Sequence, residues 1–368
     1  MKDIFRHTLS DIKPYVQGKP AEAAQREFGL ERIEKLASNE NQFGPSPKAV
    51  AAIKEELDLL NFYPEGHPFD LIEKLSEKTG LAPECFSVGN GGESLIWYIS
   101  MVLLDEGDEI VTAAPTFDIY RLSASYLGAK TIAVPLKDAA YDIDAMLAQI
   151  GPRTKIFWLA NPNNPTGHIA NREQLRAVVS RIPEDVVLVM DEAYYDFAAL
   201  KEDYPSDSVS LLKDRDNAII LRSFSKVYGL AGLRIGYLMT SPELAAKINA
   251  IKLTFGVNRL AQAGAKAALD DDEYLRSTVL RNKESVDFLE SWFRAKGWDF
   301  FPSYANFCWV NCGEDSRLIF EALQRKGVII RPGFLWGWDT WLRVSAGTEE
   351  QMRFFAEKTD EILSELHE

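Results

Sequence analysis

The chain has 368 residues, of which 46% are hydrophobic, and this length allows two folded units with substantial cores. Its formal net charge is −14 and it holds no block of basic residues, which argues against binding to nucleic acids or anionic membranes. Residues 1–6 contain no signal-peptide core and no apolar run approaches the length of a membrane span, so we expect a cytoplasmic protein.

The cysteines and histidines do not suggest a metal site. Cys85, Cys308 and Cys312 are odd in number and lie in apolar segments, so we expect reduced thiols in the core. The four histidines do not cluster with cysteines or carboxylates at the spacing of metal ligands. We therefore expect no bound metal.

Apolar segments alternate with helical patterns over the first two thirds of the chain. The predicted strands lie near 86–90, 109–115, 130–136, 155–161, 186–191, 218–223 and 235–240. This alternation predicts a mostly parallel sheet covered by helices on both faces, which is an α/β fold. Ligands of such sheets bind at the carboxyl ends of the strands.

The pattern changes from Arg259 onward. Long helical stretches are predicted at 259–269 and 272–296, followed by strands near 307–311 and 328–331. A closing helix begins at Thr348. This part of the sequence indicates a smaller α+β domain.

A glycine-rich segment, Gly89-Asn90-Gly91-Gly92-Glu93-Ser94, follows the strand near 86–90 and opens a helix. The backbone N–H groups of Gly92 and Glu93, together with the helix dipole, would face an anion. A glycine loop by itself is common in proteins. It becomes a plausible phosphate site only when a second anion-binding group lies beside it.

Two later strands end in polar residues. The strand near 155–161 runs into Asn161-Pro162-Asn163-Asn164-Pro165, a rigid turn that could be purely structural. The strand near 186–191 ends at Asp191, and Tyr194 follows it. Asp191 would also suit a helix N-cap or a buried partner for Arg234. Because parallel strands end at one edge of the sheet, we expect Asn164 and Asp191 to lie close together.

The segment from Ser223 to Arg234 follows the strand near 218–223. An isolated Lys226 would be a solvated surface charge, but a lysine just past a strand end can form an imine with an aldehyde. Arg234 lies far enough along to fold back onto a phosphate, to which the Ser223 and Ser225 hydroxyls can also donate. This grouping suits a phosphorylated aldehyde cofactor, pyridoxal 5′-phosphate (PLP).

The other polar residues match the remaining groups of PLP. Asp191 would keep the ring nitrogen protonated, so that the ring withdraws the electrons released when a bond to the substrate α-carbon breaks. Tyr194 and the amide of Asn164 would donate to the ring 3-oxygen. Lys226 would act as the base, and we expect burial and the charge of Arg234 to lower its pKa.

Taken together, residues 161–167, residues 191–194, residues 223–226 and Arg234 resemble the fold-type I, PLP-dependent aminotransferases of classes I and II, and the similarity runs nearly end to end. This resemblance implies the aspartate aminotransferase-like fold. Its large PLP-binding domain, with a seven-stranded sheet, would span 42–257. Its small discontinuous domain would combine 1–41 with 258–368, and the cofactor would lie between the two.

Within that group the chain most resembles the histidinol-phosphate aminotransferases, on segments 13–20, 35–41, 63–66, 259–262 and 342–348. The resemblance implies transfer of an amino group between histidinol phosphate and 2-oxoglutarate in histidine biosynthesis. The partners would be a small-molecule amino donor and a 2-oxo acid.

The resemblance also assigns residues that the pattern alone leaves open. It implies that Phe117 stacks on the cofactor, although an aromatic after a strand is also typical of the core. It implies that Tyr63 reaches the phosphate in the neighbouring subunit of a homodimer. The substrate would be bound by Arg343 at its α-carboxylate and by Arg331 at its distal anion, together with Tyr15 and Asn41. From its flanking residues alone, Arg343 could instead be a half-exposed edge position.

One loop departs from the histidinol-phosphate group, in which it is usually smaller and more polar. This chain places Phe334, Trp336 and Trp338 there. These rings could pack the loop, or they could narrow the pocket and favour an aromatic substrate. The alternative functions are therefore an aromatic amino-acid aminotransferase, or a related PLP enzyme repurposed for decarboxylation or oxidation.

Overall fold

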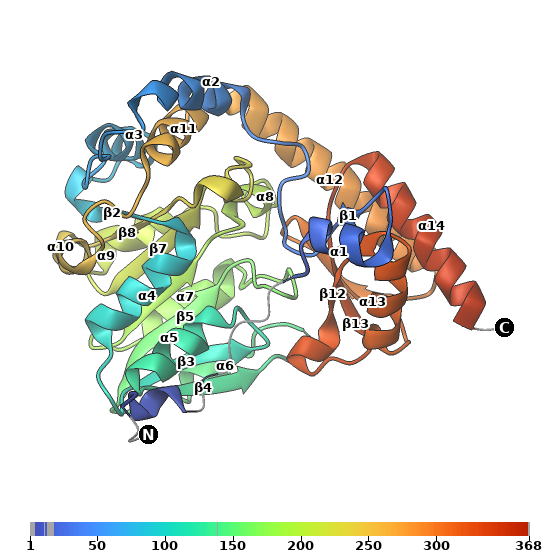
Figure 1. Ribbon diagram of the computed structural model, residues 1–368. Helices are drawn as coiled ribbons and strands as arrows, with labels where there is room; N and C mark the ends of the chain where they lie inside the picture. Colours follow the sequence, from blue (N-terminus) through green and yellow to red (C-terminus); the bar gives the residue numbers. More distant parts are fainter. Residues whose placement is uncertain (1–3, 11, 13–17, 138, 367–368) are drawn as a thin grey trace.

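The computed structural model describes residues 4–10, 12, 18–137 and 139–366. It has two parts, visible at the left and right of Figure 1. We call the part built on a seven-stranded sheet the large lobe, and the part built on a four-stranded sheet the small lobe. The long helix α12 (Asp272–Ala295) runs from the top of the molecule into the small lobe.

The seven predicted strands form one sheet, in the order β2-β8-β7-β6-β5-β3-β4. The pairs among β3 to β7 are parallel, and β8 is antiparallel to both of its neighbours. Each strand lies within one residue of its predicted bounds: β2 (Phe86–Gly89), β3 (Glu109–Ala114), β4 (Lys130–Pro135), β5 (Thr154–Ala160), β6 (Val187–Asp191), β7 (Ala218–Ser223) and β8 (Gly236–Thr240). The predicted α/β fold with a mostly parallel sheet is confirmed.

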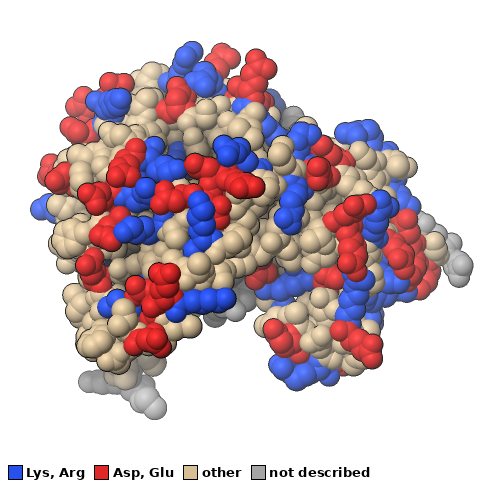
Figure 2. All heavy atoms as spheres, turned by 90° about the horizontal axis from the view of Figure 1, so that it is seen from above, with Lys and Arg blue, Asp and Glu red and all other residues tan. Residues whose placement is uncertain are grey.

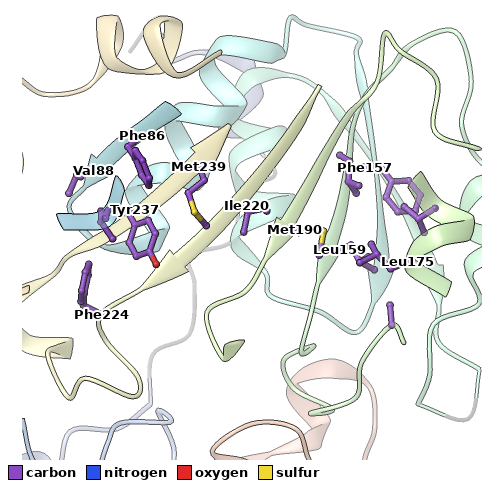
Figure 3. Close-up of a cluster of buried hydrophobic side chains, with 14 of the residues drawn as sticks. Phe86, Val88, Phe157, Leu159, Leu175, Met190, Ile220, Phe224, Tyr237 and Met239 are labelled. Carbon is purple, nitrogen blue, oxygen red and sulfur yellow. The ribbon is translucent and has the colours of Figure 1, made fainter. Parts of the chain in front are cut away.

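Helices cover both faces of this sheet, which explains why its strands are apolar on both sides. On β5, Phe157 and Leu159 point into one apolar cluster (Figure 3), while Ile156 and Trp158 point into another. The first cluster packs against α3 (Phe69–Thr79), α6 (Ile143–Leu147), α7 (Arg172–Arg181) and α11 (Arg259–Ala268). The second packs against α4 (Gly91–Leu103), α5 (Ile119–Leu127) and α10 (Pro242–Ile251).

The small lobe holds an antiparallel sheet in the order β12-β13-β10-β9, built from β9 (Asp299–Phe301), β10 (Phe307–Asn311), β12 (Arg331–Pro332) and β13 (Trp341–Ser345). One face of it packs against α12, α13 (Ser316–Arg325) and α14 (Glu349–Leu366). The single strand predicted at 328–331 is wrong in detail. It divides into β11 (Val328–Ile329) and β12, because β11 pairs with β1 (Glu34–Lys35) whereas β12 pairs with β13.

The segments that connect the lobes come from both ends of the chain. Pairing of β1 with β11 attaches the amino-terminal part to the small lobe. The helix α11, just beyond the predicted boundary at 257/258, packs against α2 (Pro47–Glu55) and α3 instead. The predicted division into domains stays a prediction. The other short elements of the described residues are α1 (Ala21–Phe28), α8 (Tyr195–Ala198), α9 (Leu211–Asp214) and the 3-10 turns His7–Leu9, Leu57–Leu59, Pro83–Cys85, Ser208–Ser210, Ala231–Leu233 and Gly333–Trp336.

The three cysteines are free thiols, with Cys308 and Cys312 buried and Cys85 partly exposed. Within the described ranges, no helix combines the length and the apolar character that crossing a bilayer requires. The same residues include no group of three or more His, Cys, Asp or Glu side chains arranged to hold a metal ion. On the face seen in Figure 2, acidic and basic side chains are interspersed.

Candidate active site

A cavity of about 640 Å³ lies where the carboxyl ends of β5, β6 and β7 face the small lobe. A second cavity, of about 670 Å³ and lined by residues of α3 and α10 among others, contains none of the predicted site residues. The first cavity is therefore the candidate site. Its lining includes Gly92, Glu93, Phe117, Asn164, Asp191, Tyr194, Ser223, Ser225, Lys226, Arg234, Arg331 and Arg343.

One end of the cavity is built to hold an anion. Gly91, at the start of α4, has φ +80°, and a Cβ added there would lie 2.6 Å from Nη2 of Arg234. A larger residue at this position would therefore displace the guanidinium from the amino terminus of the helix. Arg234 itself has φ +55°, a strained conformation of the kind that clusters at functional sites. The hydroxyls of Ser223 and Ser225 line the same cavity.

Asp191 is the last residue of β6 and is buried. Its Oδ2 accepts a 2.6 Å hydrogen bond from the hydroxyl of Tyr120, and its Oδ1 accepts one of 3.0 Å from the backbone N–H of Ala193. Burial raises the pKa of Asp191, and these two hydrogen bonds oppose the rise. A buried carboxylate at a cavity wall suits a cationic ligand atom.

The two alternatives considered for Asp191 are not what the structure contains. The N-cap of the following helix, α8, is Tyr194. The guanidinium of Arg234 donates to the backbone oxygen of Ala231 at 3.1 Å. Asp191 therefore does not cap that helix, and the acceptor of the Arg234 hydrogen bond is Ala231 rather than Asp191.

A network around Asn39 fixes the phenol of Tyr194. The Nδ2 of Asn39 donates to the hydroxyl of Tyr194 at 3.0 Å. Asn39 adopts φ +54° and is itself held by Ser345, whose hydroxyl donates to Asn39 Oδ1 at 2.9 Å, and by the amide of Asn306, which donates to its backbone oxygen. Among the described residues, none accepts the phenol's own proton, which leaves it for a ligand oxygen.

Lys226 lies at the cavity wall, half-buried. Its Nζ donates to the backbone oxygens of Ser38 at 3.3 Å and of Asn39 at 3.2 Å. Its pKa is lowered from 10.5 to about 8, first by burial and then by the charge of Arg343. The predicted direction is right, but the main charge is Arg343, and Arg234 contributes less.

Arg331 and Arg343 line the cavity from the small lobe. They lie directly across from each other on β12 and β13, and only 5% and 4% of their surfaces are exposed. The guanidinium of Arg343 donates to the side-chain oxygen of Asn164 and to the backbone oxygen of Ala37. The edge-strand alternative for Arg343 is wrong, because β13 lies between β12 and β10.

Two of the predicted residues that the structure describes, Tyr63 and Asn41, do not line the cavity. Tyr63 is 79% exposed and stacks on Phe255 with ring centroids 4.6 Å apart. The amide of Asn41 donates to the backbone oxygen of Val227 at 2.8 Å and to the hydroxyl of Tyr274 at 3.1 Å. Tyr15 lies outside the described residues.

Sequence reasoning missed several residues of the site. Tyr120 lies three residues after Phe117 in a helical pattern, and that spacing could have placed both on one face. Lys35 and Glu40 line the cavity as an ion pair of 2.9 Å, and although they lie in segment 35–41, which carries the resemblance, neither was assigned a role. Behind Asp191, Glu192 forms a buried 2.8 Å ion pair with Arg222.

The aromatic loop does not narrow the cavity. Within the described part of the chain, the lining includes none of Phe334, Trp336 and Trp338. Trp338 packs on Trp341 with ring centroids 5.1 Å apart, and Phe334 lies against the Arg317 guanidinium. Of the two roles considered for these rings, packing of the loop is the one observed.

The residues of the cavity fit PLP. The glycine and arginine cradle suits its phosphate, the buried acid suits its ring nitrogen, and the phenol suits its 3-oxygen. The partly neutral amine of Lys226 suits its aldehyde. All of these groups line the same cavity.

Comparisons with known proteins agree with this chemistry. The sequence profile of the family "Aminotransferase class I and II" matches residues 31–358. Histidinol-phosphate aminotransferase 2 of Carboxydothermus hydrogenoformans is 42% identical over 363 residues, covering 99% of this chain and 100% of that protein. Histidinol-phosphate aminotransferase of Moorella thermoacetica is 43% identical, covering 98% of this chain and 93% of that protein.

Solved structures give the same result. Histidinol-phosphate aminotransferase of Sinorhizobium meliloti, in complex with pyridoxal-5′-phosphate, superposes with a TM-score of 0.91 at 30% identity, covering 99% of this chain and 98% of that one. Aspartate aminotransferase of Thermus thermophilus, with a TM-score of 0.84 at 23% identity, shares the fold and covers 97% of this chain and 99% of that one. The profile match and the relatives above 40% identity show that this chain belongs to the class I and II aminotransferase family.

Proposed function

We propose that the protein is a PLP-dependent aminotransferase that moves an amino group between histidinol phosphate and 2-oxoglutarate in histidine biosynthesis. The observation that carries the proposal is that one cavity is lined by Lys226, by Asp191, by the residues of the proposed phosphate cradle and by a pair of arginines. The relatives at 42% and 43% identity, both named histidinol-phosphate aminotransferases, support the choice of substrate.

When bound, PLP supplies a ring that withdraws electrons from the substrate α-carbon. Asp191 would keep the ring nitrogen protonated, and Tyr194 and Asn164 would hold the 3-oxygen. Phe117 would stack on the ring. The phosphate is held by a set of donors, namely the backbone of Gly92 and Glu93 and the side chains of Ser223, Ser225 and Arg234.

Lys226 carries the proton. With its pKa lowered to about 8, a substantial fraction of the free amine is neutral near neutral pH. With PLP and substrate bound, its Nζ would serve as the base that accepts the proton of the substrate α-carbon. The carbonyl oxygens of Ser38 and Asn39, which accept hydrogen bonds from Nζ, hold the amine on the small-lobe side of the cavity.

The arginine pair suits substrates with differently placed anions. Histidinol phosphate carries a phosphate and no α-carboxylate, whereas glutamate carries two carboxylates. Arg343 binds the α-carboxylate of glutamate, and Arg331, with Tyr15, binds the distal anion of either substrate. Asn41 remains a proposed substrate residue, although its amide is engaged by Val227 and Tyr274.

A homodimer completes the proposal. Exposed apolar side chains gather on two adjoining segments, 57–69 and 251–255, including Leu60, Phe62, Tyr63, Phe69, Leu253 and Phe255. Large exposed apolar patches mark interaction surfaces. A second copy seated here would cover the patch, and Tyr63 would reach its cofactor phosphate. A cytoplasmic location stays a prediction from the sequence.

The test is a set of half-reactions followed by the absorbance of the PLP-loaded protein. Histidinol phosphate and glutamate should each convert the bound cofactor to its amino form, and phenylalanine should react far more slowly. The Lys226→Ala variant serves as the control and should react with none of them. Conversion by phenylalanine in preference to histidinol phosphate would overturn the proposed substrate.

A further inference from the structure

One face of the small-lobe sheet carries both arginines and a wall of aromatic rings. Arg331, Arg343 and Trp309 lie opposite one another in register on β12, β13 and β10, so their side chains share a face. Trp341, two residues before Arg343, stacks on Trp309 with centroids 5.6 Å apart. The opposite face of the same sheet packs into the apolar core of the small lobe.

Two like charges in directly opposite positions destabilise a sheet, and here both are almost fully buried. The two guanidinium cations therefore need neighbouring groups that stabilise a positive charge. Arg343 has the oxygens of Asn164 and Ala37. The one aromatic ring that faces both guanidiniums, among the contacts of the described residues, belongs to Trp336.

The ring of Trp336 lies 5.8 Å from Cζ of Arg331 and 5.6 Å from Cζ of Arg343. Both distances fall within the roughly 6 Å over which an aromatic face attracts a cation. The indole is held in turn by Trp309, edge to face, with centroids 5.7 Å apart at 83°. The ring is thus fixed from behind and presents its surface to the arginine pair.

We propose that Trp336 is the positioning residue of the anion-binding pair: by facing both guanidiniums, it holds Arg331 and Arg343 side by side and so sets the affinity for the anionic group of the substrate. The inference rests on the proposed function, because it assumes that the substrate anion binds this pair. The histidinol-phosphate group usually has smaller and more polar residues in this loop. The inference assigns a role to the large Trp336 side chain found here, although that side chain does not line the cavity.

The effect should be confined to binding of anions. Trp336 does not line the cavity, so its loss leaves the lysine, the acid and the phosphate cradle unchanged. Weakening two cation–π contacts predicts a loss of about tenfold in affinity for a substrate that carries the anion. A substrate without the anion should bind as before.

The test compares histidinol phosphate with histidinol, the same amine without its phosphate, in half-reactions of the PLP-loaded protein. Trp336→Leu should raise the half-saturating concentration of histidinol phosphate about tenfold, with little change in the maximal rate and none for histidinol. Trp336→Phe keeps an aromatic face and should recover most of the affinity. Equal effects on both amines would overturn the inference.

Trp338→Leu is the matched control, because it removes an indole of the same loop that packs on Trp309 and Trp341. This variant should match the unaltered protein in its preference for the phosphorylated amine. If Trp338→Leu and Trp336→Leu lose that preference equally, loop packing is responsible and the inference fails.

The inference can be separated from the proposed function. If histidinol phosphate does not react at all, calorimetric titration of the PLP-loaded protein with inorganic phosphate still probes the arginine pair. Weaker phosphate binding in Trp336→Leu than in Trp338→Leu would then support the role of Trp336 while the proposed substrate fails. Equal binding in the two variants would overturn the role of Trp336.

Discussion

The hydroxyl of Tyr120 donates a 2.6 Å hydrogen bond to Oδ2 of Asp191, although 71 positions separate the two residues. The Tyr120 ring is held by stacking on Trp158, with centroids 4.4 Å apart and an interplanar angle of 11°. Trp158 belongs to β5 and Asp191 to β6, the next strand in the sheet. The acid is therefore oriented by a helix residue that is itself packed on the sheet.

Tyr120→Phe should raise the pKa of Asp191, because the lost hydrogen bond is one of the contacts that oppose the effect of burial. Less of the carboxylate is then ionised to hold the ring proton. We expect kcat to fall about tenfold or more, since a hydrogen bond to a charged group contributes roughly 1.5–3 kcal/mol. The acidic limb of the pH–rate profile should move to higher pH.

The control for this change is Tyr141→Phe, which removes a buried hydroxyl bonded to the backbone oxygen of Ala160. The acidic limb of the pH–rate profile of Tyr141→Phe should match that of the unaltered protein. If both variants shift that limb equally, the hydrogen bond from Tyr120 does not tune Asp191.

Lys226→Met should stabilise the cofactor-free protein at pH 7. The amine has a pKa of about 8 in the folded protein and of 10.5 in the unfolded chain, so the unfolded chain binds more protons between these values. The contribution of this amine to the free energy of unfolding thus rises as the pH rises from about 8 to 10.5. Below pH 8 the buried charge lowers the free energy of unfolding by up to about 3 kcal/mol. Urea unfolding should show the gain of the variant at pH 7 and a smaller gain at pH 9.5.

The exposed Lys54 of α2 provides the comparison, because Lys54→Met removes a solvated charge. It should change the free energy of unfolding by less than about 0.5 kcal/mol at either pH. If Lys226→Met leaves the free energy of unfolding at pH 7 unchanged or lowers it, burial does not disfavour the charged form of this amine.

Gly91→Ala should weaken PLP binding, because the new Cβ would lie 2.6 Å from the Arg234 guanidinium and φ is +80°. Gly80→Ala separates the two effects. Gly80 has φ +72° with nothing within 4 Å of the added Cβ. Both variants should lose about 1 kcal/mol of stability, but only Gly91→Ala should lose PLP affinity, by tenfold or more in a spectroscopic titration. Unchanged affinity in Gly91→Ala would contradict the cradle.

Arg222→Ala should destabilise the fold strongly, since it leaves the fully buried carboxylate of Glu192 without its cation. Breaking a buried pair from one side costs about 3–5 kcal/mol. Arg181→Ala breaks an ion pair with Asp144 whose side chains are 48% and 84% exposed, and should cost less than about 1 kcal/mol. Similar losses in urea unfolding of the two variants would refute this ranking.

The strands and most of the site could be predicted because each signal is local. An apolar run that ends in Asp191, or that is followed by Lys226, predicts both a buried strand and the polar residue at its end. Because parallel strands end at the same edge of the sheet, these polar residues are predicted to lie together. The ranges of β2 to β8 follow from the same runs.

The rest depends on contacts between distant segments, which no local pattern contains. Asn39 reaches Tyr194 from another part of the chain, and its φ of +54° is set by Ser345 and Asn306 rather than by its neighbours in sequence. The larger effect of Arg343 on Lys226 arises in the same way, because the small lobe brings that arginine to the cavity. Trp336 could not be placed from sequence because its partners lie on three strands.

The central claim is that Lys226 is the residue that holds the cofactor, and Lys35 lines the same cavity as a second available amine. Borohydride reduction of the PLP-loaded protein, followed by peptide mass spectrometry, identifies the modified lysine directly. We predict one cofactor per chain, attached to the peptide that contains Lys226. Attachment at Lys35, or no stable attachment after reduction, would contradict the account.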